Sequence, residues 1–189
     1  KIQPAAEPGD IKFVDANNDG VINDDDRVFQ GSPFPDFTFA LNGNMRYKNF
    51  DLSIGLQGVL GNKIYNATRQ TLEDVTKGSN FLASCLDYWT PENTDAEFPR
   101  VLAGFDYNHY GASSMDFSVQ KASFLRLSAL TLAYTFPTKV INALKLANLR
   151  VYATGSNLFC LTNYNGYDPE TGDWYPPTRM YTFGLNLTF

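Results

Sequence analysis

The stretch Met180-Tyr181-Thr182-Phe183-Gly184-Leu185-Asn186-Leu187-Thr188-Phe189 decides how the rest of the sequence is interpreted. Bulky apolar residues occupy its odd positions, and small uncharged residues occupy the even positions from 182 to 188. A period of two places these two sets on opposite faces of a β-strand. A strand of a soluble sheet can have this pattern. A strand of a membrane barrel must have it, because one face meets lipid and the other a polar interior.

The same alternation recurs in four stretches upstream. Lys48-Asn49 joins the first two as a tight hairpin turn, and a phase slip at Ser128-Ala129 predicts a β-bulge. The predicted antiparallel strands are Phe37–Tyr47, Phe50–Val59, Phe124–Phe136, Leu149–Leu158 and Tyr181–Phe189. The apolar set expected to face lipid is Phe39, Leu41, Leu52, Ile54, Leu130, Leu132, Phe183, Leu185 and Leu187.

The connections between these strands alternate in length. The turn at 48–49 is short, 61–121 is long, 137–148 is modest and 159–178 is long. Membrane barrels have short turns on the periplasmic side and long loops outside, which would bring Phe189 to the periplasmic face. The predicted fold class is therefore all-β: antiparallel up-and-down strands that form the C-terminal part of a transmembrane β-barrel. Short helices are expected in the connections, at Ile64–Val75, Phe81–Trp89 and Thr138–Ala147.

Five strands cannot close a barrel, for which about eight are the minimum. We therefore expect the remaining strands to lie upstream of Lys1, outside these 189 residues. Residues 1–35 are predicted to be an extracellular loop and residues 36–189 to carry the barrel strands and their loops. The net charge of −5 and the scattered Lys and Arg residues argue against a nucleic-acid partner. Two cysteines, Cys85 and Cys160, are too few for a disulfide framework, and a bridge between them stays open.

An acidic stretch from residue 15 to residue 26 follows the pattern of a calcium-binding loop. Oxygen ligands stand at positions 1, 3 and 5, Gly20 allows the sharp turn at position 6, and a carboxylate stands at position 12. The alternative is an Asx-rich surface turn. The favoured prediction is a structural Ca²⁺ bound by Asp15, Asn17, Asp19, the carbonyl of Val21, and Asp26, with low affinity because Asp26 replaces the usual Glu.

Five aromatic residues of the predicted outer loops are candidate substrate contacts, because aromatic rings bury flat apolar surfaces such as those of sugars. The alternative is that they pack the loops together. They are Trp89, Tyr164, Tyr167, Trp174 and Tyr175. His109, the only histidine, has no nucleophile motif near it, and the acids of the long loop are more simply solvated charge. The sequence therefore predicts no catalytic residue, no organic cofactor and no enzyme.

Short motifs distributed over nearly the whole chain resemble the SusC/RagA family of TonB-dependent outer-membrane transporters, in the order in which that family has them. They include Gly9-Asp10-Ile11-Lys12-Phe13, Pro35-Asp36-Phe37-Thr38, Tyr47-Lys48-Asn49-Phe50-Asp51-Leu52, Tyr88-Trp89-Thr90-Pro91, Phe98-Pro99-Arg100, Ser123-Phe124-Leu125-Arg126-Leu127 and Tyr167-Asp168-Pro169-Glu170.

The resemblance implies a plugged barrel of about 22 strands in a bacterial outer membrane, with the plug upstream of Lys1. It further implies energised import of a glycan or oligopeptide, a SusD-like surface lipoprotein as partner, and contact with TonB through the absent N-terminal part. The rival interpretation is a soluble or surface β-sandwich, such as a carbohydrate-binding module with a structural calcium. That alternative does not account for the alternating loop lengths.

Overall fold

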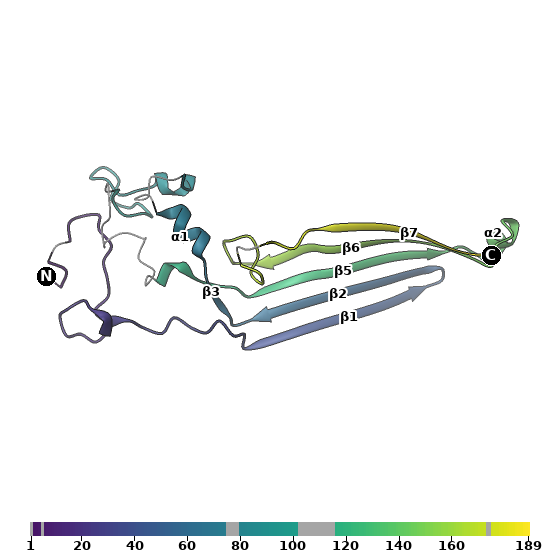
Figure 1. Ribbon diagram of the computed structural model, residues 1–189, viewed down its shortest axis with the longest axis horizontal. Helices are drawn as coiled ribbons and strands as arrows, with labels where there is room; N and C mark the ends of the chain where they lie inside the picture. Colours follow the sequence, from purple (N-terminus) through teal and green to yellow (C-terminus); the bar gives the residue numbers. More distant parts are fainter. Residues whose placement is uncertain (1, 5, 75–79, 102–115, 173–174) are drawn as a thin grey trace. The chain divides into compact units, whose positions relative to one another are not determined.

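The computed structural model describes residues 2–4, 6–74, 80–101, 116–172 and 175–189, which form two compact units. One unit contains residues 1–31 and 65–120, and the other contains residues 32–64 and 121–189. The second unit is built on a five-stranded antiparallel sheet in the order β1-β2-β5-β6-β7, whose strands lie side by side in Figure 1. The antiparallel all-β prediction is confirmed, and the sheet is open rather than closed.

All five predicted strands are present, with small differences at their ends. Their bounds are Phe37–Tyr47 (β1), Phe50–Leu60 (β2), Phe124–Thr135 (β5), Asn148–Thr162 (β6) and Met180–Thr188 (β7). The prediction for β6 was too short, because the alternation that breaks at Asn157 resumes with Phe159 and Leu161. Those two residues pair with Leu127 and Leu125 of β5, so the strand continues past its irregularity.

The predicted turn and bulge occupy the expected positions. Lys48 adopts φ 52° in the two-residue turn between β1 and β2. The register of β5 shifts between Leu127 and Ala129 on its β6 side, and β2 shifts between Gly55 and Leu56 on its β5 side. The Ser128 hydroxyl donates to the Gly55 carbonyl at 3.0 Å, which holds the two irregularities together.

The connection from β5 to β6 contains a short helix, α2 (Thr138–Ala143), rather than the predicted Thr138–Ala147. The helix ends early because Lys145 takes φ 55°, and the Leu146 amide then donates back to the Ile141 carbonyl at 3.1 Å. This is the hydrogen bond of a Schellman cap. At this end of the sheet one connection is a two-residue turn and the other, residues 136–147, contains α2.

The first unit holds little regular structure. It contains α1 (Ala67–Glu73) and 3-10 turns at Asp24–Asp26, Ala83–Leu86 and Asp116–Ser118, while β3 (Lys63–Tyr65) and β4 (Val119–Lys121) form a separate two-stranded sheet. The helix predicted from Ile64 begins later, because the Asn66 side chain caps it by accepting the Arg69 amide at 2.8 Å. Its predicted last residue lies outside the described residues. Among the described residues, no helix is long and apolar enough to cross a membrane.

The helix predicted at Phe81–Trp89 is wrong apart from one 3-10 turn. Its second half has backbone partners elsewhere, because the Trp89 amide donates to the Phe98 carbonyl and the Phe98 amide to the Asp87 carbonyl. These two bonds hold the segment extended against Phe98. Local helical spacing could not reveal that competing pairing.

Candidate functional site

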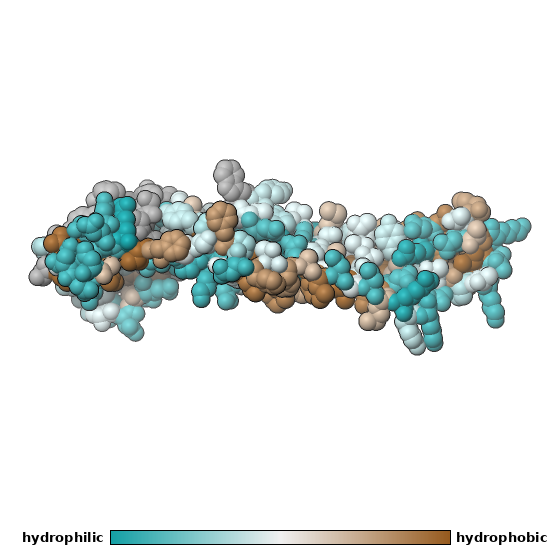
Figure 2. All heavy atoms as spheres, turned by 90° about the horizontal axis from the view of Figure 1, so that it is seen from below, coloured by the Kyte–Doolittle hydropathy of each residue, from teal (hydrophilic) through white to brown (hydrophobic). Residues whose placement is uncertain are grey.

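One face of the five-stranded sheet is apolar from edge to edge. Apolar residues stay on this face on both sides of the register shift, because Ile54 lies opposite Leu130 before it and Leu56 lies opposite Leu127 after it. Many of its side chains are exposed, with Leu41 at 61 % and Phe183 at 80 %. In Figure 2 a brown band runs along one side of the strands. The nine residues predicted to face lipid all fall on this face: Phe39, Leu41, Leu52, Ile54, Leu130, Leu132, Phe183, Leu185 and Leu187.

Aromatic rings border the apolar face near both ends of β1. At the turn end Tyr47 pairs with Phe50 and Phe50 with Tyr134, and the last two rings lie 4.7 Å apart. At the other end the rings of Phe37 and Phe39 stack at 5.8 Å. Tyr47 lies eight positions after Phe39, which is about 27 Å along the strand. At the tilt of barrel strands this corresponds to roughly 20 Å of membrane thickness, close to the apolar band between aromatic girdles in outer-membrane barrels.

The opposite face of the sheet is polar. It carries Asn42 and Asn44 on β1, Ser53 on β2, Thr131 on β5 and Asn186 on β7. All four charged residues of the five strands lie on it: Arg46, Asp51, Arg126 and Arg150. Charge is thus confined to one face, and hydrophobic bulk to the other.

The β6–β7 connection is held against the polar face by a buried ion pair. Arg126 Nη2 lies 2.6 Å from Asp168 Oδ2, and the two side chains are only 4 % and 7 % exposed. Asp168 Oδ1 also accepts the amides of Glu170 and Thr171, at 2.9 and 3.1 Å. The other Arg126 nitrogen, Nη1, lies 3.3 Å from Glu170, whose carboxylate also accepts a bond from Gln57. The Asp168 carboxylate therefore both fixes the conformation of the loop and attaches the loop to the sheet.

Asp168 stands in the motif Tyr167-Asp168-Pro169-Glu170, but the sequence predicted no role for it or for Arg126. Two signals could have found the pair. Asp168-Pro169-Glu170-Thr171-Gly172 is a turn sequence whose first residue bonds its own backbone. Arg126 is a charged residue in the polar phase of a strand, where burial requires a partner.

The candidate substrate contacts differ in how far they are exposed. Tyr167 and Tyr175 are 68 % and 75 % exposed, on the loop that Arg126 holds. Tyr164 is only 6 % exposed, and its ring covers Gly166. Trp89 is half-buried and packs on Gly9, where an added Cβ would lie 2.5 Å from the indole. Trp174 lies outside the described residues.

Trp89 belongs to a packed corner of the first unit. Gly9 has φ +92°, its carbonyl accepts the Arg100 amide, and the Arg100 guanidinium lies 2.6 Å from Asp10 and 2.5 Å from Glu7. Hydrogen bonding from Arg100 to Asp10, and then to Glu7, raises the pKa of Arg100 above its usual value. These contacts give Trp89 a structural role in addition to any contact with a ligand.

In the acidic loop, residues 15–26, carboxylate side chains accept hydrogen bonds from the backbone amides of the loop itself. Asp15 accepts the amides of Asp19 at 3.1 Å and Gly20 at 2.8 Å, and Asp26 accepts those of Ala16 and Asn23, both at 2.8 Å. The Asn23 amide is the main reason that the pKa of Asp26 lies below its ordinary value. Among the described residues, no group of three acidic, histidine or cysteine side chains is placed to hold a metal ion.

Comparison with known proteins extends over nearly the whole chain. No family model matches the sequence. TonB-dependent receptor P26 of Formosa agariphila is 35 % identical over 198 residues, which cover 96 % of this chain and 20 % of that protein. TonB-dependent receptor SusC of Bacteroides thetaiotaomicron is 32 % identical over 188 residues, covering 96 % and 18 %.

Solved structures give the same result. The RagAB peptide importer in its closed-closed state has a TM-score of 0.72 at 26 % identity, covering 85 % of this chain and 18 % of that chain. Its open-open state has a TM-score of 0.69 at 25 % identity, covering 84 % and 18 %. The chain belongs to the SusC/RagA family of TonB-dependent receptors.

This SusC/RagA chain spans about one-fifth of the length of the curated relatives it matches. Those relatives are named as receptors, and the similar structures as an importer. In the sheet of the SusC/RagA chain, polar and apolar side chains lie on opposite faces along every strand, as they do in the wall of a membrane barrel. Cys85 is buried in the first unit and Cys160 is half-buried in the second, and both are free thiols in the structure.

Proposed function

We propose that this chain forms a section of the barrel wall, with its outer loops, of an outer-membrane importer. One observation carries the proposal: the side chains of all five strands are sorted into an uncharged apolar face and a polar face that holds every charge. A soluble sheet covers its apolar face with a second layer. Here large apolar side chains such as Leu41 and Phe183 are exposed, and lipid is the medium that suits them.

The two ends of the sheet suggest its orientation. The end with the two-residue turn and α2 would face the periplasm, because periplasmic connections of such barrels are short. The end with the connections at 61–123 and 163–179 would face outward. Phe189 would then lie at the periplasmic side, as would the aromatic row of Tyr47, Phe50 and Tyr134.

The parent protein would import a glycan or oligopeptide. A SusD-like lipoprotein would serve as its outer partner, and TonB would engage it through a part outside this chain. The names of the relatives support the energised uptake, and the RagAB importer supports a peptide as one substrate class. The exposed rings of Tyr167 and Tyr175 are the best placed of the five candidate contacts, since a buried ion pair fixes the loop that carries them.

The test is to locate the full-length parent protein in its bacterium. We expect it in the outer-membrane fraction, extractable only with detergent. We also expect it to migrate differently on a denaturing gel before and after boiling, as folded barrels do. Recovery of the intact protein in the soluble fraction without detergent would overturn the proposal and favour the soluble carbohydrate-binding sandwich.

We also propose that the loop of Asp15, Asn17, Asp19, Val21 and Asp26 binds Ca²⁺ as a structural ion. In support, the carboxylates of Asp15 and Asp26 each accept two backbone amides, and each oxygen keeps a second lone pair for a cation. Calorimetric titration of the full-length protein with Ca²⁺ should give heat that the Asp15→Asn and Asp26→Asn variants lose. Equal heat from the wild type and both variants would exclude this loop as the site.

A further inference from the structure

Two lysines at the end of the sheet with the short connections have a backbone conformation that lysine rarely adopts. In the part of the chain that the structure describes, the non-glycine residues with positive φ are Asn18, Lys48, Lys145 and Asn157. Asparagine is common in this region, whereas for other side chains the Cβ lies too close to a neighbouring carbonyl oxygen. Lys48 has φ 52° in the hairpin turn, and Lys145 has φ 55° at the cap of α2. Glycine would hold either position with less strain, so the two lysines point to a function for their charge.

Hydrogen bonds of Asn49 hold the two lysine-bearing connections together. The Asn49 carbonyl accepts the Thr135 amide at 2.9 Å, and the Asn49 side chain donates to the Thr135 carbonyl at 2.7 Å. Thr135 is the last residue of β5, and the connection that contains α2 begins directly after it. The turn with Lys48 is therefore anchored to the connection with Lys139 and Lys145, and all three lysines are exposed.

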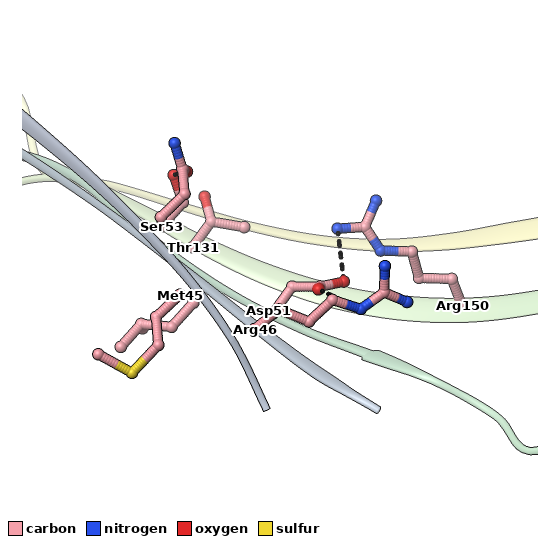
Figure 3. A pocket seen from close by; sticks show the side chains of 8 residues that line it. Met45, Arg46, Asp51, Ser53, Thr131 and Arg150 are labelled. Atoms are coloured by element: carbon pink, nitrogen blue, oxygen red, sulfur yellow. Dashed lines mark hydrogen bonds and ion pairs between the residues drawn. The ribbon is translucent and has the colours of Figure 1, made fainter. Parts of the chain in front are cut away.

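The only acid near these lysines in the sequence is already neutralised on the polar face. Residues 45–52 and 132–150 contain one acidic residue, Asp51. Its carboxylate lies 3.4 Å from Arg46 Nε and 3.6 Å from Arg150 Nη2, and Figure 3 shows both arginines beside it. None of the three lysines forms an ion pair with a carboxylate of the described residues. This end of the sheet is therefore positive, although the whole chain has a net charge of −5.

Apolar side chains stand beside the lysines. Lys48 Nζ lies 5.3 Å from the centre of the Tyr47 ring, which belongs to the aromatic row that borders the apolar face. On α2, Val140 and Leu144 are 40 % and 56 % exposed, and their spacing of four places them on one side of the helix. A lysine stands directly before Val140 and another directly after Leu144. This combination suits a membrane interface, where apolar groups meet acyl chains and amines meet phosphate.

We propose that the lysine cluster of Lys48, Lys139 and Lys145 binds the phosphate groups of anionic phospholipids, in the leaflet next to the short connections. The inference rests on the proposed function, since it takes the apolar face to lie in lipid. Charge complementarity selects this occupant, because each lysine near an anionic membrane surface strengthens binding. A zwitterionic phospholipid offers the same acyl chains without the net charge, and it should bind more weakly.

The experiment uses the full-length protein in detergent and native mass spectrometry. Phosphatidylglycerol and phosphatidylcholine with the same acyl chains are titrated separately, and the fraction of protein that carries lipid is measured. We expect phosphatidylglycerol to bind at about a tenfold lower concentration than phosphatidylcholine. Equal binding of the two lipids would overturn the proposal.

Glycine variants separate the charge of the lysines from their place in the fold. Lys48→Gly with Lys145→Gly removes two charges and relieves both positive-φ positions. This variant should keep the heat-modifiable barrel and lose about tenfold in affinity for phosphatidylglycerol. Unchanged affinity would show that the lysines are not the site. Loss of the barrel would give them a structural role and overturn the proposal as well.

Two matched variants control for charge. Lys48→Arg with Lys145→Arg keeps both charges and should keep the affinity for phosphatidylglycerol. Lys12→Gln with Lys121→Gln removes two charges from other exposed sites and should also keep it. An equal loss of affinity in the Lys12 and Lys121 variant would mean that net charge alone attracts the lipid, against the proposal. Outer-membrane location of the wild type, scored before purification, reports separately on the proposed function.

Discussion

Arg126 is the residue whose loss should change the β6–β7 connection most. Removing one partner of a buried ion pair costs about 3–5 kcal/mol, because the other charge stays buried without compensation. Arg126→Gln should therefore release the loop that Asp168 organises. Hydrogen exchange of the detergent-solubilised parent protein should show faster exchange at the amides of Glu170 and Thr171.

Two further variants show whether the ion pair is responsible. Asp168→Asn should be milder than Arg126→Gln, since its carbonyl oxygen can still accept both amides and Arg126 keeps Glu170 at 3.3 Å. Arg179→Gln removes an exposed charge from the same connection and should change nothing. Unchanged protection in Arg126→Gln would mean that other contacts hold the loop.

Cys85 should be an unreactive thiol. It is 2 % exposed, and burial, followed by the negative charge of Glu73, raises its pKa above the usual value. A raised pKa leaves less thiolate at any pH below it, and the thiolate is the form that alkylating reagents attack. In the native Cys160→Ser protein, iodoacetamide at about pH 8 should modify Cys85 far more slowly than after denaturation in urea.

The matched control for Cys85 is a thiol on the same 3-10 turn. A protein with Ser84→Cys, Cys85→Ala and Cys160→Ser presents an exposed thiol one residue away. It should react at nearly the same rate in native and denatured protein. If Cys85 reacts as fast as this control, the burial of its side chain is not maintained in solution.

At the scale of elements, the strands could be predicted because each carries its own period-two signal. Even the bulge at Ser128 was visible as a change of phase. The errors have a different origin. The segment around Trp89 is held by Phe98, a partner further along the chain that local spacing does not reveal. The ion pairs of Asp51 with Arg46 and Arg150 could not be predicted for the same reason, since they join β1, β2 and β6.

Adjacent residues of β1 offer a sharp test of which face meets lipid. Leu41 lies on the apolar face and Asn42 on the polar face, and both are exposed. Arginine at the bilayer midplane of a barrel costs about 2–4 kcal/mol, whereas interior substitutions are tolerated better. Leu41→Arg should therefore reduce the heat-modifiable form of the full-length protein, and Asn42→Arg should retain it. The opposite order would assign the faces the other way round.

At the scale of the whole molecule, the 189 residues should not be soluble when produced alone. The apolar face would meet water across all five strands, and exposed apolar patches of this kind drive aggregation. We expect the isolated chain in the insoluble fraction. A variant with Glu at positions 41, 183 and 185 should shift part of it into solution, because charge then interrupts the exposed apolar surface. A wild-type chain that stays soluble and monomeric would contradict this expectation.

The open edges of the sheet have a consequence for the strands that would close it. β1 and β7 each have one neighbour, so a row of backbone groups on each remains available to a further strand. A slip of one residue in such a pairing would exchange the two faces of the incoming strand. A strand that pairs with β7 must therefore place its apolar residues on the same face as Phe183 and Leu185. A strand that pairs with β1 must place them on the same face as Leu41. The two edge strands therefore determine which face of each added strand is apolar and which is polar.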